Sequence, residues 1–247
     1  ELGDLFIESN ESNSHNQISQ FRYAVTENKK RNNPTLAQDK IYFDSPLKFK
    51  IDEVIQYIKN VNSEIIGKLE GEGLPKKSDG TLINNRKDCY FTESVSFCEQ
   101  STAAAKRASS GPYKGDFERF ILRLETTVTN PRLKFLFDEV GESTLESVLK
   151  QFLGYEENKS NVTVIDLSGI PFEVLSITVS LISRVLFEFG YYYKKLLSGN
   201  NHCETPLLLV YEEAHKYVPK SDLVKYRASK KAIERIDIIT TQVERFA

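Results

Sequence analysis

The chain has 247 residues, of which 40% are hydrophobic, so it is long enough to bury a substantial apolar core. The chain contains 33 lysine and arginine residues and 35 aspartate and glutamate residues. The resulting net charge of -2 excludes an overall positive potential that would attract nucleic acid non-specifically. Cys89, Cys98 and Cys203 lack CxxC spacing, which argues against a disulfide framework and against a zinc site.

The sequence lacks an apolar run of the roughly 20 residues that a bilayer-spanning helix requires. Its first residues also lack the basic, apolar and small-residue regions of a secretory signal. We therefore expect a cytoplasmic protein that has no membrane partner.

Amphipathic helical patterns dominate the first part of the chain. After a turn signal at residues 44–46, apolar residues recur at three- and four-residue spacing up to Ile65, which predicts a helix. Residues 71–87 have the composition of a mobile loop. Asp116 can cap a second helix that ends before Asn130, and a further helix follows Ser143. We predict that residues 1–160 form a mainly helical insertion or subdomain.

Two short apolar segments after this boundary are typical of buried parallel strands. They are residues 162–167, which end at a Ser-Gly turn, and residues 206–211. Between them, residues 171–197 have the apolar face of a long helix, with Pro171 in its first turn. The order strand, helix, strand predicts a βαβ unit with a parallel sheet, and we assign residues 161–247 to an α/β core.

Two acids, Glu212 and Glu213, directly follow the second predicted strand. Ligands of open parallel sheets bind beyond the carboxyl ends of the strands, so these carboxylates are candidate site residues. A nucleoside triphosphatase needs one carboxylate for hydrated Mg²⁺ and a second that orients and deprotonates the attacking water. We assign Glu212 to magnesium and Glu213 to the water. Alternatively, the two acids only stabilise the N-terminus of a following helix.

The segment that contains the acids resembles a known motif. Residues 207–215, Leu-Leu-Leu-Val-Tyr-Glu-Glu-Ala-His, resemble the Walker B segment of the HerA branch of the FtsK-HerA superfamily of P-loop ATPases. Residues 164–169 are similar to the upstream strand and turn of that family, and residues 132–137 and 230–235 to segments that flank its core. The resemblance extends over residues 116–236 and is loose for the first hundred.

This resemblance implies a RecA-like P-loop core, built on a parallel sheet, with a large and mainly helical insertion. It implies a homo-hexameric translocase or helicase that couples hydrolysis of ATP, with Mg²⁺, to movement of duplex DNA through a central channel. A nuclease or a sirtuin-like effector would be its partner, in DNA end processing or antiviral defence. The alternative is a non-catalytic scaffold with an ATPase fold that assembles a partner enzyme.

The sequence departs from the family in two places. It contains no GxxxxGK[ST] phosphate loop, which in the family lies upstream of the insertion and would therefore precede Glu1. We thus expect this chain alone not to bind ATP tightly. After Ile236 the family continues with a Gly-Arg-Lys stretch and a strand that has a polar sensor, whereas here residues 237–241 follow at once. If they are that strand, Gln242 is the candidate sensor.

Further candidates lie after the acids. His215 couples the nucleotide state to the DNA channel, or is only a structural hydrogen-bonding residue at a helix start. Arg227 and Arg235 are candidate fingers that act across a subunit boundary, because stabilising γ-phosphate charge there needs a guanidinium. Alternatively, both are solvated arginines on a basic helix. Short basic clusters are either solvated or contact DNA phosphates; these are residues 29–31, 76–77 and 230–231.

Overall fold

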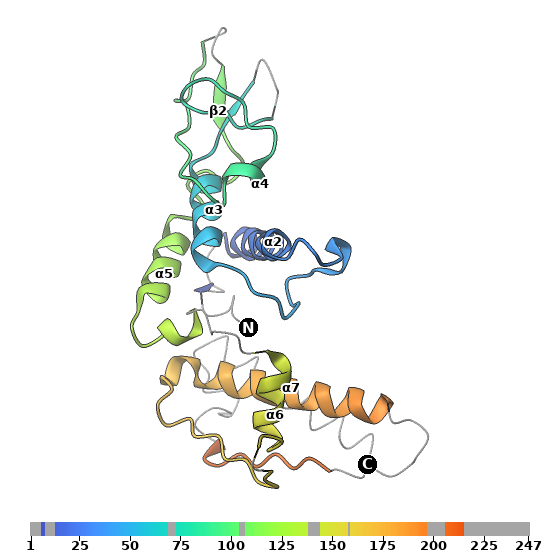
Figure 1. Ribbon diagram of the computed structural model, residues 1–247. Coiled ribbons are helices and arrows are strands. Elements are labelled where there is room, and N and C mark those ends of the chain that lie inside the picture. Colours follow the sequence, from blue (N-terminus) through green and yellow to red (C-terminus); the bar gives the residue numbers. More distant parts are fainter. Residues whose placement is uncertain are drawn as a thin grey trace. The chain divides into compact units, whose positions relative to one another are not determined.

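The chain consists of two compact units (Figure 1). The N-terminal unit is Phe6–Phe137, and the C-terminal unit is Glu1–Leu5 together with Asp138–Ala247. The computed structural model describes residues 6–7, 13–68, 73–103, 107–137, 144–157, 159–196 and 206–214. The predicted domain boundary at residue 160 stays a prediction.

Three helices form the core of the N-terminal unit. They are α2 (Ser14–Asn32), α3 (Ile51–Ser63) and α5 (Glu118–Thr129), and α3 packs against both of the others. Aromatic rings fill the space between them, with the ring centroids of Phe21 and Phe120 6.1 Å apart. The predicted helices at α3 and α5 are present, but α3 ends before Ile65. Asp116 does not cap α5, whose first turn follows Phe117; the backbone N–H of Phe117 donates to Asn62 Oδ1 at 2.8 Å.

A small antiparallel sheet follows α3. Strand β1 (Ile65–Gly67) pairs with β2 (Ala108–Ser110), with Ile65 opposite Ser110. The described part of the predicted loop 71–87 is folded against this sheet, since Ile66 pairs with Pro75 and Lys76 with Leu82. Among the described residues of this unit, the remaining short elements are α4 (Arg86–Cys89) and two 3-10 helices, Gln38–Lys40 and Lys134–Leu136.

The C-terminal unit contains two described helices. The first, α6 (Leu145–Phe152), begins with a reciprocal capping box between Thr144 and Ser147. The second, α7 (Phe172–Leu196), begins directly after Pro171, as its position predicts. One face of α7 is buried, and its apolar residues include Val174, Leu175, Val179 and Leu186. The predicted long helix of this region is therefore present.

The prediction of two strands in a parallel sheet is wrong for the part of the chain that the structure describes. Residues 162–167 and 206–211 have no strand hydrogen bonding, and the described residues contain a single sheet, the antiparallel pair β1–β2. Val164 is 85% exposed and Leu208 83%, whereas strands of a parallel sheet are covered on both faces. The described architecture is mostly helical and is not a RecA-like α/β core.

Helix α7 corrects the expectation that the chain contains no segment long and apolar enough to cross a bilayer. Its segment Val174–Leu196 is long and apolar enough to cross a bilayer by length and composition alone. A core helix of a water-soluble protein satisfies the same criteria, and the face of α7 that packs within its unit contains the buried serines Ser176, Ser180 and Ser183.

Candidate functional site

The segment that contains Glu212 and Glu213 is anchored on α7. Tyr211 and Ala214, which flank the acids, both pack against the buried pair Leu175 and Val179 of that helix. The Tyr211 hydroxyl also donates a hydrogen bond of 2.7 Å to Ser183 Oγ. The acids therefore lie between two residues that are fixed to the same helix.

The turn that follows residues 162–167 is held at the same place on α7. Leu167 and Ile170 pack against the same buried pair as Tyr211 and Ala214. Within this turn the backbone N–H of Ser168 donates to Asp166 at 2.9 Å, and hydrogen bonds from Ser168 lower the pKa of that carboxyl below its ordinary value. The two segments that were predicted to be parallel strands of one βαβ unit thus converge on one helix without forming a sheet.

Both acids are exposed, and the backbone of Glu213 is strained. Glu213 has a φ of 51°, in the left-handed region, and it is the only non-glycine residue with positive φ in the described ranges. This conformation costs a residue with a Cβ on the order of 1 kcal/mol. Such strain collects at functional sites, where the surrounding structure holds it in place. Here the anchored neighbours Tyr211 and Ala214 hold it.

The acid pair fits a hydrated magnesium ion better than a metal held by protein alone. Mg²⁺ keeps several waters and needs one or two carboxylates in addition to substrate phosphates. Two adjacent exposed carboxylates satisfy that requirement. Among the described residues there is no group of three or more His, Cys, Asp or Glu side chains that would enclose an ion.

The other predicted site residues lie outside the described residues. These are His215, Arg227, Arg235 and Gln242, and the basic pair 230–231 is outside them too. The predicted acid pair is thus the part of the candidate site that the structure places.

Several lysines of the predicted basic clusters are engaged within the N-terminal unit. Lys29 is buried, and its Nζ donates to the backbone oxygens of Phe43 and Ser45 at 2.6 and 2.7 Å. Burial lowers the pKa of Lys29. Lys30 pairs with Glu27 at 3.0 Å, and Lys77 with Glu93 at 3.1 Å. Lys29 in particular is not available to a phosphate.

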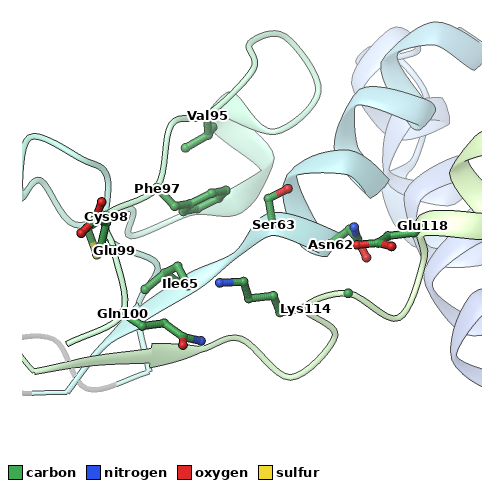
Figure 2. Close-up of a pocket in the computed structure, with 11 residues that line it drawn as sticks. Asn62, Ser63, Ile65, Val95, Phe97, Cys98, Glu99, Gln100, Lys114 and Glu118 are labelled. Carbon is green, nitrogen blue, oxygen red and sulfur yellow. The ribbon is translucent and has the colours of Figure 1, made fainter. Parts of the chain in front are cut away.

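The N-terminal unit contains a hollow of about 570 Å³ that the sequence did not indicate (Figure 2). It lies where the end of α3, β1 and the start of α5 meet the extended residues 95–100. Three of its charged side chains, Glu99, Lys114 and Glu118, form no ion pair with any described residue. Catalytic groups are normally held by packing and by supporting hydrogen bonds, so this lining does not define a reaction site.

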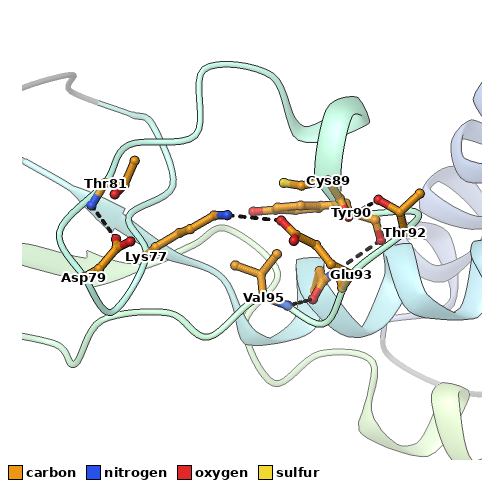
Figure 3. Close-up of polar contacts among 9 residues, drawn as sticks. Lys77, Asp79, Thr81, Cys89, Tyr90, Thr92, Glu93 and Val95 are labelled. Carbon is orange, nitrogen blue, oxygen red and sulfur yellow. Dashed lines mark hydrogen bonds and ion pairs between the residues drawn. The ribbon is translucent and has the colours of Figure 1, made fainter.

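A polar network beside this hollow stabilises the unit (Figure 3). The Asn60 amide donates to the backbone oxygens of Tyr90 and Glu93, at 3.0 and 2.8 Å, and its Oδ1 accepts from the N–H of Val95 at 3.0 Å. Cys89, nearby, is a free thiol whose pKa is raised by burial. The network connects α3 to the chain after α4, and its role is structural.

Comparison with protein-family models finds no match for this chain, and comparison with curated proteins finds none either. The resemblance to HerA-type ATPases therefore stays a prediction that rests on the residues quoted for it.

Proposed function

We propose that this chain contributes the acidic pair of an ATP-hydrolysing DNA translocase or helicase of HerA type. The strained and anchored backbone at Glu213 is the observation that supports this proposal. A turn that only capped a helix has no need of a non-glycine residue in the left-handed region. The assignment of the acids rests on the motif of residues 207–215 and on this turn, because the described residues contain no parallel sheet.

In this proposal the two carboxylates have different roles. Glu212 binds the hydrated Mg²⁺ that accompanies ATP, and Glu213 orients and deprotonates the water that attacks the γ-phosphate. Both side chains are exposed, so a nucleotide bound by another part of the protein has access to them. The phosphate-binding groups must come from outside these 247 residues, because the sequence contains no GxxxxGK[ST] motif.

The remaining parts of the proposal follow from the resemblance. They are duplex DNA as the substrate, a homo-hexamer as the assembly, a nuclease or sirtuin-like effector as the partner, and the cytoplasm as the location. Repair of DNA ends and antiviral defence are the two processes in which such an assembly would act.

The test is the ATPase activity of the full-length protein, with and without duplex DNA. Glu213→Gln removes the base while keeping the size of the side chain, so hydrolysis should fall by at least about 100-fold, within the range general-base catalysis contributes. Nucleotide binding should be retained. Glu156→Gln changes an exposed acid elsewhere in the same unit and is the matched control. Equal hydrolysis by the wild type and Glu213→Gln would refute the assignment.

The second candidate function is a non-catalytic scaffold that assembles a partner enzyme. The exposed apolar surface of residues 206–210 favours it, because such surface is typical of a protein interface. This alternative predicts no hydrolysis by full-length protein under any DNA condition, together with a partner complex that Glu213→Gln leaves intact. Size-exclusion chromatography with the co-purified partner distinguishes the two functions.

A further inference from the structure

The last turns of α7 expose an unusual concentration of aromatic side chains. Tyr191 is 45% exposed, Tyr192 59% and Tyr193 44%. Lys194 and Lys195 follow directly, at the C-terminal end of the helix. We call residues 191–195 the Tyr-Lys end of α7 (Figure 1).

The buried face of α7, as far as the structure describes the unit, does not include this surface. The buried face of the helix ends at Leu186, which is 3% exposed, and every residue from 191 to 196 is exposed. The two lysines are in the last turn, where they offset the negative end of the helix dipole. The tyrosines contribute nothing to that effect.

The rings are also held in defined orientations. Phe189 and Tyr193, one turn apart, stack with centroids 5.7 Å apart and an interplanar angle of 18°. Tyr191 and Tyr192 contact edge to face, with centroids 5.4 Å apart and an angle of 79°. Rings that are already oriented lose little conformational entropy when a flat ligand stacks on them.

We propose that the Tyr-Lys end of α7 binds single-stranded nucleic acid. Exposed aromatic faces stack on unpaired bases without regard to sequence, and an adjacent lysine neutralises a backbone phosphate. Lys194 forms no ion pair with a described residue, so its charge is available to a phosphate. Base pairs within a duplex cover the base faces, so duplex DNA offers these rings only its ends.

A bilayer is the less favoured occupant of this surface. The preceding turns of α7 contain the ion pair between Arg184 and Glu188, at 2.8 Å, and three buried serines. An interfacial helix requires a continuous apolar face with cations on the other side, and here tyrosines and lysines alternate around the helix end.

This inference does not rest on the proposed ATPase. Its test uses no nucleotide, so a failure of strand binding and a failure of ATP hydrolysis are separate results. The full-length protein is titrated, without ATP, into dye-labelled oligo-dT and oligo-U of about 20 nucleotides, a length that exceeds one stacking site. Fluorescence anisotropy reports binding, and a duplex of equal length is the competitor.

The variants separate stacking from charge. Tyr192→Ala and Tyr193→Ala should each weaken binding by about 5- to 100-fold, whereas Tyr192→Phe should retain it, because the ring is what stacks. Lys194→Gln should lower the slope of log affinity against log salt by about 0.7. Tyr155→Ala and Lys159→Gln are matched controls, since both side chains are exposed elsewhere in the unit.

The outcomes are decisive in both directions. The inference is supported if the two tyrosine-to-alanine variants at 192 and 193 lose binding to either oligonucleotide and the control variants keep it. The oligonucleotide that the wild type binds more tightly then shows whether the ligand is DNA or RNA. Wild-type affinity in the two tyrosine-to-alanine variants overturns the inference. The inference is also overturned if the duplex competes for the protein as strongly as the single strand does. It is overturned too if the same variants lose binding to anionic phosphatidylserine vesicles but still bind the oligonucleotides.

Discussion

Arg86 donates two hydrogen bonds to the carboxylate of Glu64, from Nε at 2.6 Å and from Nη2 at 3.1 Å. Glu64 is only 2% exposed, and the Tyr90 hydroxyl donates to the same carboxylate at 2.7 Å. The hydrogen bonds to this carboxylate raise the pKa of Arg86. Burial raises the pKa of Tyr90, and its hydrogen bond to Glu64 raises that pKa further. The end of α3 and the short helix α4 are therefore joined through one buried charge.

Removing one member of this pair should destabilise the N-terminal unit strongly. Arg86→Leu leaves the Glu64 carboxylate buried without its cation, which costs about 3–5 kcal/mol for a buried pair. Because Arg86 is itself partly exposed, we expect the lower end of that range. Urea unfolding followed by circular dichroism measures the change. The control is Glu146→Gln, which breaks an exposed pair with Lys150 and should leave the stability nearly unchanged.

Two glycine-to-alanine substitutions should have opposite signs. A Cβ at Gly111 would lie 2.9 Å from the Glu64 carboxylate and 3.1 Å from its backbone oxygen, so Gly111→Ala should destabilise by about 1–3 kcal/mol. Gly190 lies inside α7 with open space around its Cα, so Gly190→Ala should stabilise by up to about 1 kcal/mol. Thermal unfolding of both variants, compared with the wild type, checks the pair. Destabilisation by Gly190→Ala would show that its surroundings are closed.

Glu27 should make the N-terminal unit sensitive to acid. Burial by itself raises the pKa of Glu27, but hydrogen bonds from Lys87 at 2.5 Å and Lys30 at 3.0 Å outweigh it, so the pKa lies below its ordinary value. A lowered folded-state pKa means that the stabilisation is complete above the unfolded-state pKa of 4.5 and is lost as the pH falls through the folded-state value. Glu27→Gln should flatten this decline in stability measured between neutral and acidic pH.

The stability of the protein should depend on whether the residue at position 213 has a Cβ. Glycine adopts the left-handed region without steric cost, so Glu213→Gly should be more stable than Glu213→Ala by about 1 kcal/mol. Chemical denaturation of the two variants measures the difference, and both should lose ATP hydrolysis. Equal stability of the two would mean that the backbone at this turn relaxes when the carboxylate is removed.

The helices could be predicted from local patterns, whereas the sheet could not. Spacing of apolar residues and the position of Pro171 predicted α3, α5 and α7, because helical hydrogen bonds are local in sequence. Residues 162–167 have the composition of a strand, but a strand requires a partner, and the identity of a partner is not a local property. The composition of residues 162–167 therefore did not reveal that these residues are exposed and unpaired.

The candidate site, too, could be predicted only in part from local sequence. The adjacent acids Glu212 and Glu213 were evident from the sequence, yet their anchoring was not, since Tyr211 and Ser183 are 28 residues apart. The buried charge at Glu64 was also missed. A single glutamate after a helix is an ordinary surface pattern, and its partner Arg86 lies 22 residues further along the chain.

The one-sided burial of α7 has a mechanical consequence. The helix is buried up to Leu186 and exposed at its end, so about 15 Å of it, at 1.5 Å per residue, extends past its last buried residue. A tilt of about 10° at Leu186 would displace Leu196 by nearly 3 Å, half a helical pitch. In such a tilt, the part of α7 up to Leu186 would be the pivot and residues 187–196, none of which is buried, the lever arm. A change in the packing of Tyr211 or Ala214 on Leu175 and Val179 that tilted the helix would therefore move its exposed end furthest.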